Sequence, residues 1–422
     1  METIVTSKNN IEIISYSCPG MHHTELSVYL RYGSMYETDC QNGTAHFYEH
    51  ILFRNLNKLY GGDFYHRLDL NCIDFNAATY KELIQITVKF LPRCTDFVLD
   101  ILEKIFSPIV LTADEISAER NRIRAEIRES STWDLEDEAA KTVWRDTTLA
   151  NPVLGTRGSI AKIRKKQLVE AHRKIFSARN ILVCLTGNVP DELLSKAKAV
   201  LEQQNCTQDV PFRDNIAPVP KDFGNRSCKI VSARSDDARM RLSFDFDCKK
   251  IEKPCRNLLY DTMFIGDFCK FYQQLSEKTG LVYSYDSYLG EYRNIGTFSV
   301  FLEYANGDFL SVLCEIVKIL NEIKRGNFDL SCTRANYILG NAFILDNPND
   351  LNWELVFPEK FLGTDYTFAD KARIYGNITK EQIMYAAREI FTTDNLVAVF
   401  KNKATEADLQ AAREIFAELD VL

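Results

Sequence analysis

The sequence lacks any hydrophobic run of the roughly 18–20 apolar residues that a membrane-spanning helix needs. Residues 1–17 have no basic start leading into an apolar stretch, so we expect no secretory signal peptide there. Positive charge is also scarce, because 51 Lys and Arg residues stand against 59 Asp and Glu residues, for a formal net charge of −8. This balance disfavours nucleic acid or an anionic membrane as the main partner.

No cysteine pair has the two-residue spacing of a zinc knuckle or a redox motif, although the chain contains 12 cysteines. Scattered cysteines without an export signal are typical of buried thiols in a reducing compartment. We therefore predict a cytoplasmic protein whose cysteines are buried thiols.

The length of 422 residues exceeds what one ordinary core accommodates and favours two domains of about 200 residues each. Residues 206–225 contain three prolines and little periodicity, which is typical of a linker. We therefore predict an N-terminal domain over 1–205, a linker over 206–225 and a C-terminal domain over 226–422.

Both halves mix strand and helix patterns. Residues 11–17, 26–32 and 83–90 alternate apolar and polar side chains as strands do, whereas 44–55 and 113–128 have the spacing of helices. Strand-like and helix-like segments follow one another again after residue 240. The sequence therefore predicts an α+β fold.

A helix-then-strand segment occurs twice, at 163–183 and 378–398, and the two copies align without a gap. The matches include Lys165/Lys380, Gln167/Gln382, Ala171/Ala386, Arg173/Arg388, Ile175/Ile390, Phe176/Phe391 and Asn180/Asn395. Identity at this many positions favours a duplicated domain. We predict two homologous domains.

Residues 43–50 read Gly-Thr-Ala-His-Phe-Tyr-Glu-His. On a helix, His46 and His50 lie on one face about 6 Å apart, so both imidazoles can reach one zinc ion. Glu49 projects near the same face and can act as general base on the attacking water without being a ligand. The alternative is a helix that carries these three residues by chance. The other histidines have no comparable partners and are interpreted as surface or packing residues: His22, His23, His66 and His172.

A catalytic zinc ion needs a third protein ligand beyond two histidines, and a carboxylate completes a common set. Spacing alone does not choose among Glu115, Glu119, Glu126 and Glu129, which lie in or beside one helical stretch. A solvated helix face is the expected place for most of these carboxylates.

The order His-x-x-Glu-His is that of inverted zinc peptidases, and here the sequence resembles the insulinase, or pitrilysin-type, family, which includes the mitochondrial processing peptidases. The resemblance, over about residues 25–400, rests also on Gly33–Glu37, Asn76–Thr79, Asn151–Gly155, Gly158–Ile160 and Leu275–Ser284. It implies a zinc metalloendopeptidase with one zinc ion per chain. It further implies that each domain is a mostly antiparallel sheet packed with helices, and that the chain forms half of a clamshell.

The resemblance also implies roles for particular residues. The family carries its third ligand on a later helix, with a supporting glutamate seven residues earlier, and Glu126 and Glu119 match that pair. Glu126 would then be the ligand, and Glu119 would orient a ligating histidine for catalysis. An extended substrate would pair with the strand at Asn76, Ala77 and Ala78. Asn76 would also hydrogen-bond the substrate backbone near the scissile carbonyl, and a role as a strand-end turn residue is an equal alternative.

The C-terminal domain departs from the family at one position. Many members carry an arginine seven residues before a tyrosine, and the pair holds the substrate backbone and the developing oxyanion. Tyr283 matches the substrate-binding tyrosine, but Ser276 stands in place of the arginine. Serine lacks the planar charged fork of arginine. The departure favours a heterodimer with a homologous sister chain; a homodimer, or another arginine such as Arg241 or Arg256, is the alternative.

The predicted function is a zinc endopeptidase that cleaves peptides in an enclosed chamber. The paired-chain interpretation favours maturation of a small ribosomally made peptide over general peptide scavenging. The alternative from another class is a non-catalytic peptide-binding or scaffold subunit. Because such relatives typically lose the metal ligands and this chain has a complete set, we favour the enzyme.

Overall fold

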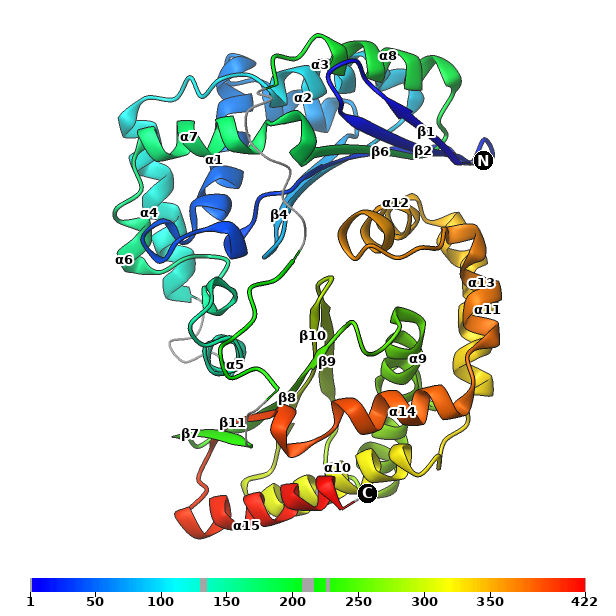
Figure 1. The fold of residues 1–422 in the computed structure, drawn as a ribbon. Helices are drawn as coiled ribbons and strands as arrows, with labels where there is room; N and C mark the ends of the chain where they lie inside the picture. The colour runs from blue at the N-terminus through cyan, green and yellow to red at the C-terminus, as the bar shows by residue number, and fades with distance from the viewer. Residues whose placement is uncertain (1, 130–134, 207–215, 225–227, 422) are drawn as a thin grey trace. The chain divides into compact units, whose positions relative to one another are not determined.

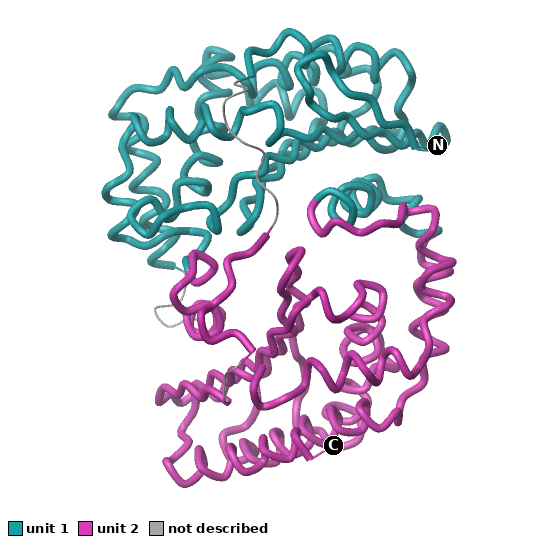
Figure 2. The backbone as a smooth tube through the Cα atoms, viewed as in Figure 1, with its two compact units in different colours: residues 1–132, 151–215, 342–360 teal, residues 133–150, 216–341, 361–422 magenta. Residues whose placement is uncertain are grey.

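The computed structural model describes residues 2–129, 135–206, 216–224 and 228–421. The chain forms two compact units, one of residues 1–132, 151–215 and 342–360 and the other of residues 133–150, 216–341 and 361–422 (Figure 2). Of the predicted linker, residues 207–215 and 225 lie outside the described residues. The domain boundaries at 205 and 226 stay a prediction. The compact units depart from them in two segments, because residues 133–150 belong to the second unit and residues 342–360 to the first.

Unit 1 contains a six-stranded sheet of order β1-β2-β6-β3-β5-β4. Only β2 and β6 pair in parallel; every other neighbouring pair is antiparallel. All residues of β3 and β6 are buried, as expected of central strands covered on both faces. The strands are β1 (Glu2–Thr6), β2 (Glu12–Ser17), β3 (Thr24–Leu30), β4 (Asp74–Thr79), β5 (Ile84–Phe90) and β6 (Ile181–Gly187).

Helices cover both faces of this sheet (Figure 1). Apolar side chains of α1, α2, α3, α7 and α8 form one core with alternate residues of the strands, such as Leu26 and Val28. On the other face, α12 packs on β3 and β6, where Tyr29 donates a hydrogen bond to Asn352 at 2.8 Å. The helices are α1 (Thr44–Leu59), α2 (Phe64–Leu70), α3 (Thr95–Ile105), α4 (Ala113–Glu129), α6 (Arg157–Ile160), α7 (Lys165–Ile175), α8 (Asp191–Glu202) and α12 (Pro348–Val356).

Unit 2 contains a five-stranded sheet of order β7-β11-β8-β10-β9. Its single parallel pair is β7 and β11, and the other pairs are antiparallel. The order and directions reproduce β2-β6-β3-β5-β4 of unit 1, so the sheets are duplicates. The strands are β7 (Lys229–Arg234), β8 (Ala238–Asp247), β9 (Tyr285–Glu291), β10 (Ile295–Tyr304) and β11 (Leu396–Asn402).

The helices of unit 2 follow the same plan. Those of one face share a core with β8, β10 and β11, while α5 packs on β8 and β11. The sequence repeat corresponds to α7 followed by β6 and α14 followed by β11. The predicted α+β fold is therefore confirmed. The helices are α5 (Leu135–Val143), α9 (Lys253–Phe264), α10 (Phe309–Lys324), α13 (Lys371–Asn377), α14 (Lys380–Ile390) and α15 (Glu406–Ala417); α11 (Ser331–Asp346) continues from unit 2 into unit 1.

Each unit thus takes one helix from the other half of the sequence. In unit 1 this helix is α12, and in unit 2 it is α5. Each packs against the central strands of its sheet. The exchange was not predicted from sequence.

None of the helices in the described ranges is both long enough and apolar enough to cross a membrane. The twelve cysteines are all free thiols, and the expectation that they are buried is wrong for four of them. Cys94, Cys184, Cys248, Cys255 and Cys269 are buried, Cys18, Cys206 and Cys228 are half-buried, and Cys40, Cys72, Cys314 and Cys332 are exposed.

The carboxyl of Glu25 on β3 gives unit 1 a specific pH dependence of stability. Burial raises its pKa from 4.5 to about 7, although the hydrogen bond from Ser27 and the charge of Lys89 oppose the shift. A raised pKa in the folded state means that the protonated carboxyl favours folding, and this contribution is lost as the pH rises through about 7. The amide of Glu25→Gln stays uncharged at every pH. As the pH rises from 4.5 to 8, the unfolding free energy of the unaltered protein should therefore fall by up to about 3 kcal/mol relative to that of Glu25→Gln.

Urea unfolding of both proteins at pH 5 and pH 8 measures this difference. Glu406→Gln, at an exposed position, is the matched control and should follow the unaltered protein at both pH values. Parallel pH profiles for Glu25→Gln and the unaltered protein would contradict the assignment.

Candidate metal centre

Helix α1 buries Phe47, Ile51 and Leu56 in the core of unit 1 and turns His46, Glu49 and His50 toward α4 and β4. Its N-cap, Gly43, has a φ of 87°, in the left-handed region that favours glycine. A Cβ at this position would lie 2.8 Å from Cα of Gly155. The helix start therefore depends on glycine for both its conformation and its packing.

Glu37 supplies the cap that Gly43 cannot. Its buried carboxylate accepts hydrogen bonds from the backbone N–H groups of Gly43 at 2.7 Å and Ala45 at 2.5 Å. Burial raises the pKa of Glu37 to about 7, and these backbone hydrogen bonds oppose the shift. Because His46 is the third residue of α1, Glu37 fixes the helical turn that carries this histidine.

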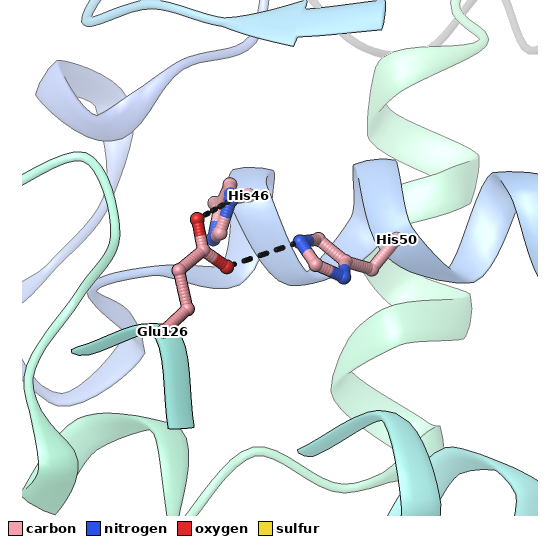
Figure 3. Close-up of side chains that lie close together, drawn as sticks. All are labelled: His46, His50 and Glu126. Carbon is pink, nitrogen blue, oxygen red and sulfur yellow. Dashed lines mark ion pairs between the residues drawn. The ribbon is translucent and has the colours of Figure 1, made fainter. Parts of the chain in front are cut away.

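Glu126 on α4 lies beside both histidines of α1. His46 Nε2 is 3.6 Å from one carboxylate oxygen of Glu126, and His50 Nε2 is 3.5 Å from the other (Figure 3). One ligand atom from each of the three residues can be chosen so that all lie within 4.8 Å of one another. Two ligands on a tetrahedral zinc ion are about 3.3–3.5 Å apart, given bonds of about 2.0–2.2 Å. The spacing therefore fits a single zinc ion.

The electrostatics also fit a metal. Burial, together with the neighbouring His50, lowers the pKa of His46 to about 4, so its imidazole is neutral at pH 7 and can donate a lone pair. His50 Nδ1 lies 2.9 Å from Glu119 Oε1, which leaves His50 Nε2 to face Glu126. Two imidazoles and one carboxylate form a common set of catalytic zinc ligands.

Glu119 lies behind His50 and is almost fully buried, with 1% of its side chain exposed. Burial raises the pKa of Glu119, but hydrogen bonds from His50 and Arg54 outweigh that effect and hold the pKa below its usual value. Glu119 is therefore a carboxylate that faces His50, which is the placement expected of the supporting glutamate.

Glu49 is half-buried and lies close enough to His50 and Glu126 to interact with their charges. Burial raises its pKa, a hydrogen bond from Thr79 Oγ1 lowers it, and Glu126 raises it further. A carboxylate with a raised pKa beside a set of metal ligands is a suitable general base near neutral pH.

The remaining carboxylates of α4 lie elsewhere. Glu115 accepts hydrogen bonds from Lys58 at 2.7 and 2.9 Å, and Glu129 is exposed at the end of the helix. The structure therefore brings together His46, His50 and Glu126, the set that the family resemblance implies and that spacing left open.

Strand β4 is an edge of the unit 1 sheet, and among the described residues only β5 pairs with it. Asn76, Ala77 and Ala78 all lie on β4, so the predicted substrate strand has one open edge. The Asn76 side chain accepts a hydrogen bond from the backbone N–H of Ala77 at 2.9 Å, a local contact typical of turn residues.

Tyr283 belongs to unit 2, and 97% of it is exposed. Ser276 donates a hydrogen bond to the Val282 carbonyl at 2.6 Å and so stabilises the turn before Tyr283. Arg256 is buried and bound to Glu291, which makes it unsuitable as a substitute for the missing arginine. Arg241 lies 3.8 Å from Glu136, with 13% of its side chain exposed.

A model of the insulinase family, peptidase family M16, matches residues 12–157. A second model, of the M16 peptidase inactive domain, matches residues 162–331. The chain belongs to this family. Glu49 and the three candidate metal ligands lie within the first match. Ser276 and Tyr283 lie within the second.

Curated relatives and a solved structure are similar to this chain over nearly its whole length. A Rickettsia felis protein named as an uncharacterised zinc protease is 23% identical over 407 residues, 93% of this chain and 95% of the relative. A Bacillus subtilis protein, also named as an uncharacterised zinc protease, is 21% identical over 406 residues, 93% of this chain and 97% of the relative. A solved protease from Helicobacter pylori has a TM-score of 0.84 at 17% identity and covers 95% of this chain and 99% of its own. At this identity the solved structure supports the fold.

Three residues of this M16 chain support the predicted site, and no such role was predicted for them. Thr79 donates a hydrogen bond to Glu49, and Arg54 donates one to Glu119. Glu37 caps α1, the helix that carries His46 and His50. Arg54 follows His50 by one helical turn, and this spacing is a sequence signal that could have identified it. Thr79 reaches Glu49 through tertiary packing. Glu37 lies before α1 and close in sequence to its partners Gly43 and Ala45.

Proposed function

We propose that the chain is a zinc-dependent endopeptidase that cleaves extended peptides at the metal centre of unit 1. The observation that carries this proposal is the group of His46, His50 and Glu126, with Glu49 beside it. The names of the curated relatives support zinc as the metal. We expect one zinc ion per chain.

In this proposal the chain supplies the general base, the residues that hold this base and the metal ligands in place, and the strand that binds the substrate. Zinc, when bound, supplies Lewis-acid chemistry that polarises the peptide carbonyl and acidifies water. Glu49 takes a proton from the attacking water and passes it to the leaving amine. Thr79 holds the Glu49 carboxylate from β4, and Glu119 holds the His50 ring.

The substrate is a peptide in extended conformation. Its backbone pairs with the open edge of β4 at Asn76, Ala77 and Ala78, which selects for an extended chain more than for particular side chains. Thr79 ends this strand and binds Glu49, so a peptide bond near that end of β4 lies close to the base.

We further propose a cytoplasmic heterodimer with a homologous sister chain that matures a small ribosomally made peptide. Ser276 carries no charge and binds a backbone carbonyl, and Arg256 is buried, so neither residue supplies an arginine side chain for the substrate. Tyr283 is exposed and available to the peptide. The sister chain would supply the arginine and close the chamber.

The test measures zinc content and hydrolysis of an unstructured peptide by the chain alone, after chelation, and with the sister chain. We expect one zinc ion per chain, loss of cleavage on chelation, and about 10²–10³-fold slower cleavage without the partner, as for loss of one oxyanion donor. Bound zinc without cleavage in any mixture would favour the non-catalytic subunit. Equal turnover with and without the sister chain would reject the heterodimer.

A further inference from the structure

Arg54 lies on α1 one turn after His50, with 38% of its side chain exposed. Its Nε donates a hydrogen bond to Oε2 of Glu119, while Oε1 of the same carboxylate lies 2.9 Å from His50 Nδ1. The two oxygens of one buried carboxylate are thus divided between a metal ligand and an arginine.

The division matters because the terminal torsion of a glutamate is broad, so a single hydrogen bond leaves the carboxylate plane free to rotate. A second hydrogen bond, from the rigid guanidinium fork of Arg54, fixes that plane. With Oε1 held toward His50, the imidazole keeps its proton on Nδ1 and presents Nε2 to the metal.

We propose that Arg54 is a positioning residue that orients the metal ligand His50 through Glu119. The proposal rests on the zinc site of the proposed function but not on peptide cleavage. Arg54 is one residue of a contact chain that runs from Arg54 through Glu119 to His50 and ends at the metal.

Arg122 provides a matched control within the same cluster. Its Nη1 lies 3.7 Å from Glu119 Oε1, but 71% of its side chain is exposed and no hydrogen bond joins it to Glu119 among the described contacts. Arg122 therefore contributes positive charge near Glu119 without holding the carboxylate.

The first measurement is the zinc dissociation constant, obtained by competition with a chromophoric chelator. We expect Arg54→Met to weaken zinc binding about 10–100-fold, the usual effect of losing a group that holds a ligand. Arg54→Lys keeps the positive charge but lacks the planar guanidinium, so its zinc dissociation constant should lie between those of Arg54→Met and the unaltered protein. Arg122→Met should change the constant no more than about fivefold, as expected of an exposed ion pair.

A double-mutant cycle distinguishes positioning from a general loss of structure. On a Glu119→Ala background, Arg54→Met should cause no further loss of zinc affinity, because Arg54 acts only through Glu119. Circular dichroism of each variant checks that the fold is retained. An equal loss from Arg54→Met with and without Glu119 would overturn the proposal.

The second measurement needs no zinc. Proton–nitrogen correlation spectra of the metal-free protein should show His50 protonated on Nδ1 in the unaltered protein and a mixture of tautomers in Arg54→Met. An unchanged tautomer together with zinc affinity within about fivefold of the unaltered protein would overturn the proposal. A chain that binds zinc and cleaves no peptide would contradict the proposed function and leave the role of Arg54 standing.

Discussion

Glu49→Gln is expected to keep its zinc ion and to lose peptide hydrolysis by at least about 10²–10⁴-fold, the usual contribution of a general base. The amide fills the space of the carboxylate and can still accept the hydrogen bond from Thr79, so the site should remain assembled. It has no basic oxygen to take the proton of the attacking water. The loss should therefore appear in kcat with little change in zinc content.

Single-turnover cleavage of an unstructured peptide, at matched zinc occupancy, measures this effect. The matched control is Glu115→Gln, which makes the same change on α4 at a residue bound to Lys58 and should retain activity. If Glu49→Gln kept more than about a hundredth of the unaltered kcat, the general base would have to be another group.

Glu126→Ala is expected to lose most of its bound zinc, whereas Glu129→Ala should keep it. Loss of one of three ligands leaves only the two imidazoles, and two ligands hold zinc poorly. Glu119→Ala should fall between these variants, with an affinity loss of about 10–100-fold, because it holds a ligand and is not one itself. The order of the three variants is the diagnostic result.

Metal analysis of the three purified proteins after dialysis against buffered zinc provides the measurement, and circular dichroism checks the fold. Glu129 is the matched control because it lies on the same helix and is exposed. Full zinc occupancy in Glu126→Ala would show that another carboxylate completes the site.

The helical part of the metal site could be predicted from sequence because its geometry is local. The spacing of His46 and His50 places both on one face of any helix, and the structure has them there. Glu126 could not be chosen in this way, because α4 lies far along the chain and its rotation against α1 is set by packing. Only the family resemblance selected it among the four glutamates.

The duplicated α+β fold was also predictable, since the repeat at 163–183 and 378–398 preserves helix, turn and strand. The placement of α12 was not. Periodicity shows that a helix has a buried face, but it does not show which sheet covers that face. The same limit applies to Thr79, whose partner Glu49 lies on another element.

The exchange of α5 and α12 has a consequence for how the protein is made. Emergence of residues 1–225 from the ribosome leaves β3 and β6 uncovered on one face, because α12 is synthesised more than a hundred residues later. Until then Tyr29 lacks its partner Asn352. The metal-binding half therefore completes its packing only after most of the second half has been translated, and a gene truncated at the boundary between the halves would encode a fragment with an open sheet face.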